Sequence, residues 1–261
     1  MVLLMHQTDT SAKDVSTDSY HGRIRIFDIA RGIAVVSMVL FHGCYDLAYL
    51  SHVSLPWFSG LFQDIWRASI SWTFLFIAGC MCYYSHNNIV RGTKLLALSF
   101  GIYIVTTIAA VDTPISFGII FCMGSCGIIA GLLKRFQLLP SGILPACICF
   151  CLFLITYNVS HGTLELGFTT VDIPRMLYET PWLSWLGFPG PHFLSGDYYP
   201  VIPYLFMYLT GTALLSRPIE QGFPAWVYSL HCTPLEFIGR HALLIYVVHQ
   251  PLLLVLTSLF V

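Results

Sequence analysis

The sequence predicts an all-α integral membrane protein, a bundle of about seven transmembrane helices with a cytoplasmic N-terminus. Of its 261 residues, 56% are hydrophobic and 10% are charged, and the mean hydropathy is +0.75. This composition is typical of polytopic membrane proteins. Apolar runs long enough to cross roughly 30 Å of hydrocarbon recur along the chain, and positive charge collects at alternate ends of these runs.

The spans are expected at 26–48, 67–85, 93–111, 114–133, 139–158, 200–216 and 239–260. With the N-terminus inside, ten of the twelve Lys and Arg residues are cytoplasmic, and only Arg67 and Arg175 are external. This distribution follows the positive-inside rule. Residues 181–193, PWLSWLGFPGPHF, are aromatic and broken by prolines. A re-entrant or interfacial segment is expected there, with an eighth span as the alternative.

Residues 23–261 are expected to form one transmembrane domain with an outward-facing loop at about 159–199. Residues 1–22 are polar and lack the charged start, apolar core and cleavage site of a signal peptide. A disordered cytoplasmic tail is expected. No internal repeat is visible, although inverted repeats are common in secondary transporters.

Charge and cysteine usage exclude two classes of partner. Twelve basic residues against thirteen acidic ones leave no basic surplus for nucleic acid. The cysteines within apolar runs are expected to act as small hydrophobes: they are Cys80, Cys82, Cys122, Cys126, Cys147, Cys149 and Cys151. No metal is expected, because the stretch with alternating cysteines, 147–151, lacks neighbouring carboxylates and imidazoles.

The first predicted span carries four ionisable residues, which need partners or a function at membrane depth: Asp28, Arg31, His42 and Asp46. The step from Arg31 to His42 is close to three helical turns, so both lie on one face, about 16 Å apart. Asp46 follows His42 by one turn, where a carboxylate orients an imidazole and raises its basicity. A general-base dyad is predicted. The alternative is a snorkelling Arg31 and a packing His42.

Further polar residues lie at the ends of the later spans. Arg67 follows Asp64 by three residues, so it either forms an interfacial ion pair or serves the site. Asp197 precedes Pro200 and Pro203, which are expected to distort the start of the sixth span; a helix N-terminal charge is the alternative role of Asp197.

Two histidines are also candidates. His249 is expected near mid-membrane in the last span, where it would line a cavity; Arg240 precedes it at the cytoplasmic end. His52 lies at the outer mouth of the first span, where a solvated loop residue is the simpler interpretation.

Four blocks carry a resemblance to a known family: RIRIFDIARGIAVVSMVLFHGCYDL, WRASISWTFLFIAG, SGDYYPVIPYLFMYLTG and FIGRHALLIYVVHQPLL. In this order they resemble the heparan-alpha-glucosaminide N-acetyltransferase catalytic-domain family of transmembrane acyltransferases. The spacing of Arg31 and His42, an Arg and a His with ten residues between them, also resembles the motif of related bacterial O-acyltransferases.

The resemblance implies transfer of an acetyl or other short acyl group from cytoplasmic acyl-CoA to a sugar or glycan beyond the membrane. It implies that His42 is the catalytic histidine, Asp46 its partner and Arg31 a contact to the CoA phosphates, and His52 resembles a histidine that follows the first helix in this family. From their positions in the sequence, Arg240 is expected to bind the cofactor with Arg31, and Arg67, Asp197 and His249, with His52, to line the substrate cavity. Phe121 departs from the pattern, because a polar His or Gln is expected there.

Direct transfer and an acyl-histidine intermediate are both compatible with these residues. A proton-coupled transporter is the rival function, and a non-catalytic scaffold would leave the polar face of the first helix unexplained. The acceptor, the acyl group and the oligomeric state, a homo-oligomer included, stay open. The expected location is the bilayer of a bacterial inner membrane.

Overall fold

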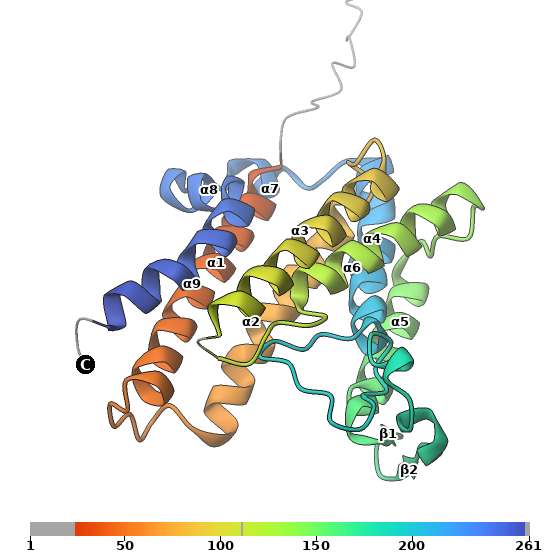
Figure 1. Cartoon of the computed structure of the whole chain (residues 1–261). Coiled ribbons are helices and arrows are strands. Elements are labelled where there is room, and N and C mark those ends of the chain that lie inside the picture. Colours follow the sequence, from red (N-terminus) through yellow and green to blue (C-terminus); the bar gives the residue numbers. More distant parts are fainter. Residues whose placement is uncertain (1–23, 111, 259–261) are drawn as a thin grey trace, which may run out of the picture.

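The computed structural model describes residues 24–110 and 112–258, and this part of the chain is mostly α-helical (Figure 1). A π-helical turn, Asp46–Leu50, continues the first helix. The predicted tail, residues 1–22, lies outside the described residues. The α-helices are α1 (Arg25–Tyr45), α2 (Gly60–Cys80), α3 (Asn88–Ala109), α4 (Ile119–Arg135), α5 (Ile143–Thr156), α6 (Val201–Gln221), α7 (Ala225–Ser229), α8 (Thr233–Arg240) and α9 (Ala242–Thr257).

Each of the seven predicted spans overlaps one of the helices α1–α6 and α9. Within the described residues, three segments are long and apolar enough to cross a membrane, and α8 with α9 makes a fourth if this pair, bent by 82°, counts as one span. The three are Arg25–Leu50, Asn88–Ala109 and Ile143–His161.

The other helices that overlap predicted spans, α2, α4 and α6, are not among these segments, for two reasons. Helix α4 has only 17 residues, while residues such as Arg67 in α2 and Arg217 in α6 lower the mean hydropathy of those helices. The structure therefore confirms a mostly helical chain with three or four candidate spans, which is fewer than the seven predicted.

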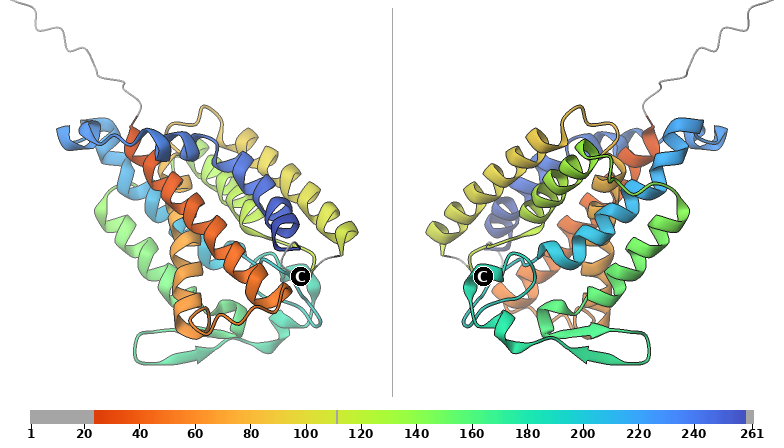
Figure 2. Two further views of the ribbon diagram at one scale, coloured as in Figure 1. Left: turned by 90° about the vertical axis from the view of Figure 1, so that its left-hand side faces the viewer. Right: turned by 90° about the vertical axis from the view of Figure 1, so that its right-hand side faces the viewer.

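The long helices run between two ends of the molecule (Figures 1 and 2). One end carries residue 24, α7 and α8, and is named the α8 end. The opposite end carries the strands β1 (Thr163–Glu165) and β2 (Thr170–Asp172), and is named the hairpin end. The strands pair antiparallel, with Leu164 opposite Val171.

The connection between α5 and α6 contains the hairpin and three short 3₁₀ turns, Val159–His161, Arg175–Tyr178 and Pro181–Leu183. All its residues are described, and it contains no α-helix. Residues 181–193 therefore do not form an eighth helical span.

Local sequence sets where several helices begin. The side chain of Asn87 accepts the N–H of Val90 at 3.1 Å, so α3 begins at Asn88. Pro234 lies in the first turn of α8, where a missing N–H costs nothing. At the start of α6, Ile202 has non-helical angles (φ −93°, ψ 125°) beside Pro203. This confirms the predicted distortion.

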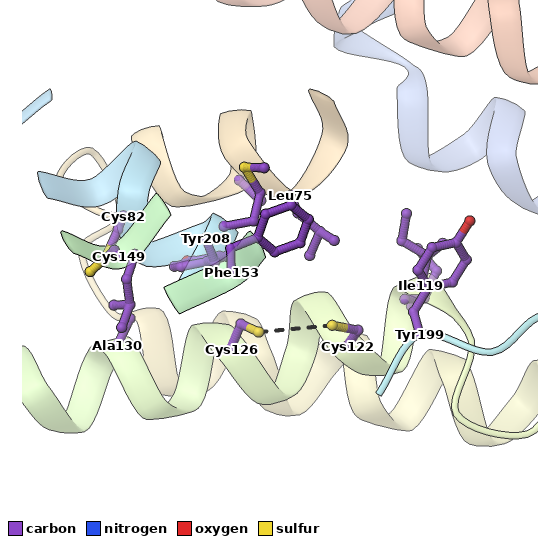
Figure 3. Packing of buried hydrophobic residues seen from close by; sticks show 14 residues of the cluster. Leu75, Cys82, Ile119, Cys122, Cys126, Ala130, Cys149, Phe153, Tyr199 and Tyr208 are labelled. Atoms are coloured by element: carbon purple, nitrogen blue, oxygen red, sulfur yellow. Dashed lines mark hydrogen bonds between the residues drawn. The ribbon is translucent and has the colours of Figure 1, made fainter. Parts of the chain in front are cut away.

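The main apolar core lies between α2, α4, α5 and α6, and includes Leu75, Phe153 and Tyr208 (Figure 3). Five cysteines, Cys80, Cys82, Cys122, Cys126 and Cys149, are buried, whereas Cys147 and Cys151 are exposed. All nine are free thiols. The buried cysteines therefore pack as small hydrophobes, as predicted.

Candidate functional site

Helix α1 places Arg31 and His42 on one continuous α-helix. Their eleven-residue step corresponds to an axial rise of about 16 Å. The neighbouring face of α1 packs into the core through Ala34, Val35 and Met38. Arg31 lies near the start of α1, at the α8 end, and His42 lies in its last turn.

His42 faces His249 of α9. The two ring centroids lie 5.0 Å apart, and the ring planes are inclined by 59°. His249 is buried, and its Nδ1 lies 2.6 Å from the carbonyl oxygen of Tyr246. The fold thus brings together two histidines that are separated by most of the chain.

Asp46 binds a different partner from the one predicted. Its fully buried carboxylate accepts two hydrogen bonds from Nε2 of Gln250, at 3.0 and 3.1 Å. No hydrogen bond or ion pair joins Asp46 to His42 in the described part of the chain. Asp46 still follows His42 with α-helical geometry (φ −62°, ψ −41°), and its N–H bonds the carbonyl oxygen of His42. The spacing assumed in the prediction is therefore present, but α9 places the amide of Gln250 against the carboxylate.

Gln250 is the residue of this group that the prediction did not include. The signal in the sequence was a polar amide inside the apolar run of the last helix, directly after His249. Buried polar groups need hydrogen-bond partners. A buried carboxylate elsewhere in the chain was therefore a reasonable partner to look for.

Arg31 and Arg240 meet at the α8 end through the buried carboxylate of Asp28. Nη1 of Arg31 lies 3.2 Å from Asp28, and Nε of Arg240 lies 3.9 Å from it. Arg240 also pairs with Glu236 at 3.2 Å. The two predicted CoA contacts are thus close together within one network of charges. Glu236 was not among the predicted site residues, although Glu and Arg four residues apart are a common helical pair.

Two glycines let α8 lie directly on α1. A Cβ atom on Gly239 would come within 1.9 Å of the carbonyl oxygen of Asp28, and one on Gly32 within 2.1 Å of that of Leu235. The close backbone contact fixes the guanidinium of Arg240 beside the start of α1.

The predicted residues at the hairpin end form separate groups. Arg67 pairs with Asp64 at 3.1 Å, and both side chains are well exposed, at 61% and 65%. Asp197 accepts the N–H of Ile119 at 3.1 Å, so it serves the start of α4, not of α6. Burial raises the pKa of Asp197 to about 6, against the opposing effects of the Ile119 N–H and the Arg67 charge.

His52 has a left-handed backbone (φ 54°) and lines a pocket of about 350 Å³ at the hairpin end, beside Tyr49 and Phe58. No hydrogen bond, ion pair or ring contact in the described residues joins it to His42 or His249. The structure therefore leaves His52 apart from the histidine pair.

Phe121, the departure from the expected pattern, belongs to an aromatic cluster. Its ring lies 4.9 Å from that of Phe117, which stacks on Phe193 at 5.9 Å; Phe193 in turn lies 4.9 Å from Tyr198. The Phe121 ring thus packs on Phe117, and Phe117 contacts the long connection before α6.

Residues 24–110 and 112–258 contain no group of three or more His, Cys, Asp and Glu residues arranged to hold a metal ion. The comparison with curated proteins found no match, and neither did the comparison with solved structures. The family model described as heparan-alpha-glucosaminide N-acetyltransferase, catalytic, matches residues 23–251, which is most of the chain. The chain therefore belongs to the heparan-alpha-glucosaminide N-acetyltransferase catalytic family, a family of membrane acetyltransferases.

Proposed function

We propose that this protein transfers an acetyl or other short acyl group from cytoplasmic acyl-CoA to a hydroxyl or amino group of a sugar or glycan on the far side of the membrane. One observation supports this most directly. In a chain of an acetyltransferase family, two imidazoles, those of His42 and His249, face each other at 5.0 Å between two helices.

In this proposal α1–α6 and α9 all cross the bilayer of a bacterial plasma membrane, and α8 lies along its cytoplasmic surface. The arrangement of positive charge supports it, because helix ends that lie towards the α8 end (Figure 1) are rich in basic residues. These are α8, the first turns of α1 and α3, and the last turns of α4 and α6, with Arg25, Arg31, Arg91, Lys94, Lys134, Arg135, Arg217 and Arg240. Helices shorter than the hydrocarbon thickness are accommodated by local thinning of the bilayer.

Arg31 and Arg240 would bind the phosphates of the CoA. The Arg240 side chain is 45% exposed and the Arg31 side chain 23% exposed, so the phosphates would share guanidinium groups already oriented by Asp28 and Glu236. Charge-assisted bonds of this kind are short and strong.

The pantetheine arm would follow an apolar groove of about 390 Å³ between α1, α2 and α6. Its lining includes Ala30, Phe76 and Met207. Ala30 directly precedes Arg31 in α1. The axial step of about 16 Å from Arg31 to His42 matches the length of an extended pantetheine arm.

His42 would act as the general base. The acceptor oxygen or nitrogen forms a bond to the thioester carbon while the C–S bond breaks. The acceptor proton passes to His42 and then to the thiolate of CoA, which restores the neutral imidazole. Asp46 would be a positioning residue, since its contact with Gln250 ties α9 to α1.

Arg67, Asp197 and His52 lie towards the hairpin end, where the acceptor would enter. Arg67 and Asp197 influence each other electrostatically, and His52 lines a separate pocket. The acceptor would therefore approach from the side opposite to the phosphate-binding arginines.

The test is release of free CoA from acetyl-CoA by the purified, detergent-solubilised chain in the presence of a panel of sugars. His42→Ala should lose acceptor-dependent release, whereas His241→Ala, which changes an exposed imidazole at the start of α9, should keep it. Full activity of His42→Ala would refute the role of His42. A protein that does not bind acetyl-CoA at all would favour a transporter.

A further inference from the structure

Two neighbouring side chains on α9 each carry a buried hydrogen-bond acceptor without a partner among the described residues. They are Nε2 of His249 and Oε1 of Gln250. A buried polar atom of this kind costs free energy unless a ligand or another group satisfies it. Both atoms belong to the layer where α9 meets α1.

The hydrogen bond to Tyr246 determines which ring nitrogen of His249 carries the proton. A backbone carbonyl oxygen only accepts hydrogen bonds, so Nδ1 of His249, 2.6 Å from it, carries the proton. In the neutral ring the lone pair then lies on Nε2. The nitrogen without a partner is therefore an acceptor.

The bond to Asp46 decides the orientation of Gln250 in the same way. The carboxylate of Asp46 accepts, so the amide group turned towards it is the NH₂. This leaves Oε1 turned away from Asp46, also as an acceptor. On the side that lacks a partner, neither side chain has a hydrogen-bond donor. The two side chains therefore cannot satisfy each other.

We propose that His249 Nε2 and Gln250 Oε1 form the subsite that holds the hydrogens of the nucleophile to be acylated. Its ligand is a group with at least two N–H or O–H hydrogens within reach, such as a primary amine or a hydroxyl with a neighbouring hydroxyl. The inference rests on the proposed function and deepens it. His42 lies across from His249, so a nucleophile held here would lie next to the proposed base.

The variant that tests this is His249→Asn. Its amide nitrogen takes the place of Nδ1 and keeps the bond to Tyr246, while the acceptor at Nε2 is lost. The matched control is His241→Asn, because Nδ1 of His241 also lies 2.8 Å from a backbone carbonyl, that of Phe237, but its ring is exposed.

The expected result is a rise of about tenfold or more in the KM for the acceptor in His249→Asn, with the KM for acetyl-CoA unchanged, since one buried hydrogen bond is lost. His241→Asn should leave both constants unchanged. An equal change in both KM values would indicate a structural role for His249 and overturn the subsite. An unchanged acceptor KM would overturn it too.

A second measurement uses the unmodified protein and so does not depend on a variant that folds. An acceptor sugar and its analogue methylated at the reacting group are compared as competitive ligands. A site that binds hydrogens rejects an analogue that lacks them. Equal affinity for both would contradict the proposal, and so would an ordered water held by both atoms in the acceptor-bound enzyme.

Parallel assays with an amino sugar and its hydroxyl counterpart would show which of the two nucleophiles the subsite selects. The outcomes also separate the two proposals. If the unmodified protein releases no CoA with any acceptor, the proposed function fails and the subsite with it. If it transfers acyl groups and His249→Asn behaves like the unmodified protein, only the subsite fails.

Discussion

The carboxylate of Asp46 is held by the side-chain amide of Gln250, 204 residues further along the chain, through two hydrogen bonds of 3.0 and 3.1 Å. This contact ties α9 to the end of α1. It therefore determines how His249, the neighbour of Gln250, is presented to His42.

Removing one partner of this contact should destabilise the protein. Gln250→Leu leaves a buried carboxylate without a donor, so the free energy of unfolding should fall by about 1.5–3 kcal/mol. The double variant Asp46→Leu, Gln250→Leu removes both polar groups and should regain part of the loss. Thermal unfolding in detergent measures both. Additive losses in the double variant would show that the two side chains are not coupled.

The close crossing of α1 and α8 predicts a sharp difference between two glycines. Gly32→Ala places a Cβ 2.1 Å from the carbonyl oxygen of Leu235, so the helices must separate, at a cost of about 1–3 kcal/mol. Gly101→Ala in α3 is the control, because a Cβ there meets nothing within 4 Å.

In that control the better helix propensity of Ala should leave stability unchanged or raise it. The midpoint of thermal unfolding measures both variants. Similar midpoints for Gly32→Ala and Gly101→Ala would mean that α8 does not pack on α1 as described.

The raised pKa of Asp197 predicts a dependence of stability on pH. A carboxyl group with a pKa of about 6 in the folded state, above its ordinary value of 3.8, favours folding below pH 4, and this contribution disappears as the pH rises through 6. Asp197→Asn keeps an oxygen for the Ile119 N–H but does not titrate.

The stability of the unmodified protein relative to Asp197→Asn should therefore decline between pH 4 and 7, by up to about 3 kcal/mol. Unfolding of both proteins in detergent across this range gives the difference. Parallel profiles would show that Asp197 titrates normally.

Filling the apolar groove should hinder the acyl donor. Ala30→Trp places an indole in the groove and should raise the KM for acetyl-CoA by about tenfold or more, because the donor must compete with the ring for the same volume. Ile33→Trp is the control, since Ile33 is 54% exposed and does not line the groove. Equal KM values in the two variants would place the pantetheine arm elsewhere.

Features that depend on residues close together in the chain could be predicted from the sequence alone. Apolar runs gave the positions of the long helices, and prolines predicted the irregular start of α6. Only three or four of the segments in the described residues are long and apolar enough to count as candidate spans, because α4 is short and polar residues such as Arg67 and Arg217 lower the mean hydropathy of α2 and α6. The four ordered blocks were enough to identify the family.

The partners of the polar residues depended on tertiary structure. Helical spacing predicted that Asp46 would orient His42, but the packing of α9 on α1 places Gln250 within hydrogen-bond distance of the carboxylate instead. Asp197 serves α4, a helix that precedes it by many residues. Spacing along one helix cannot reveal such contacts, since a buried charge binds whichever donor the packing of distant helices brings within hydrogen-bond distance.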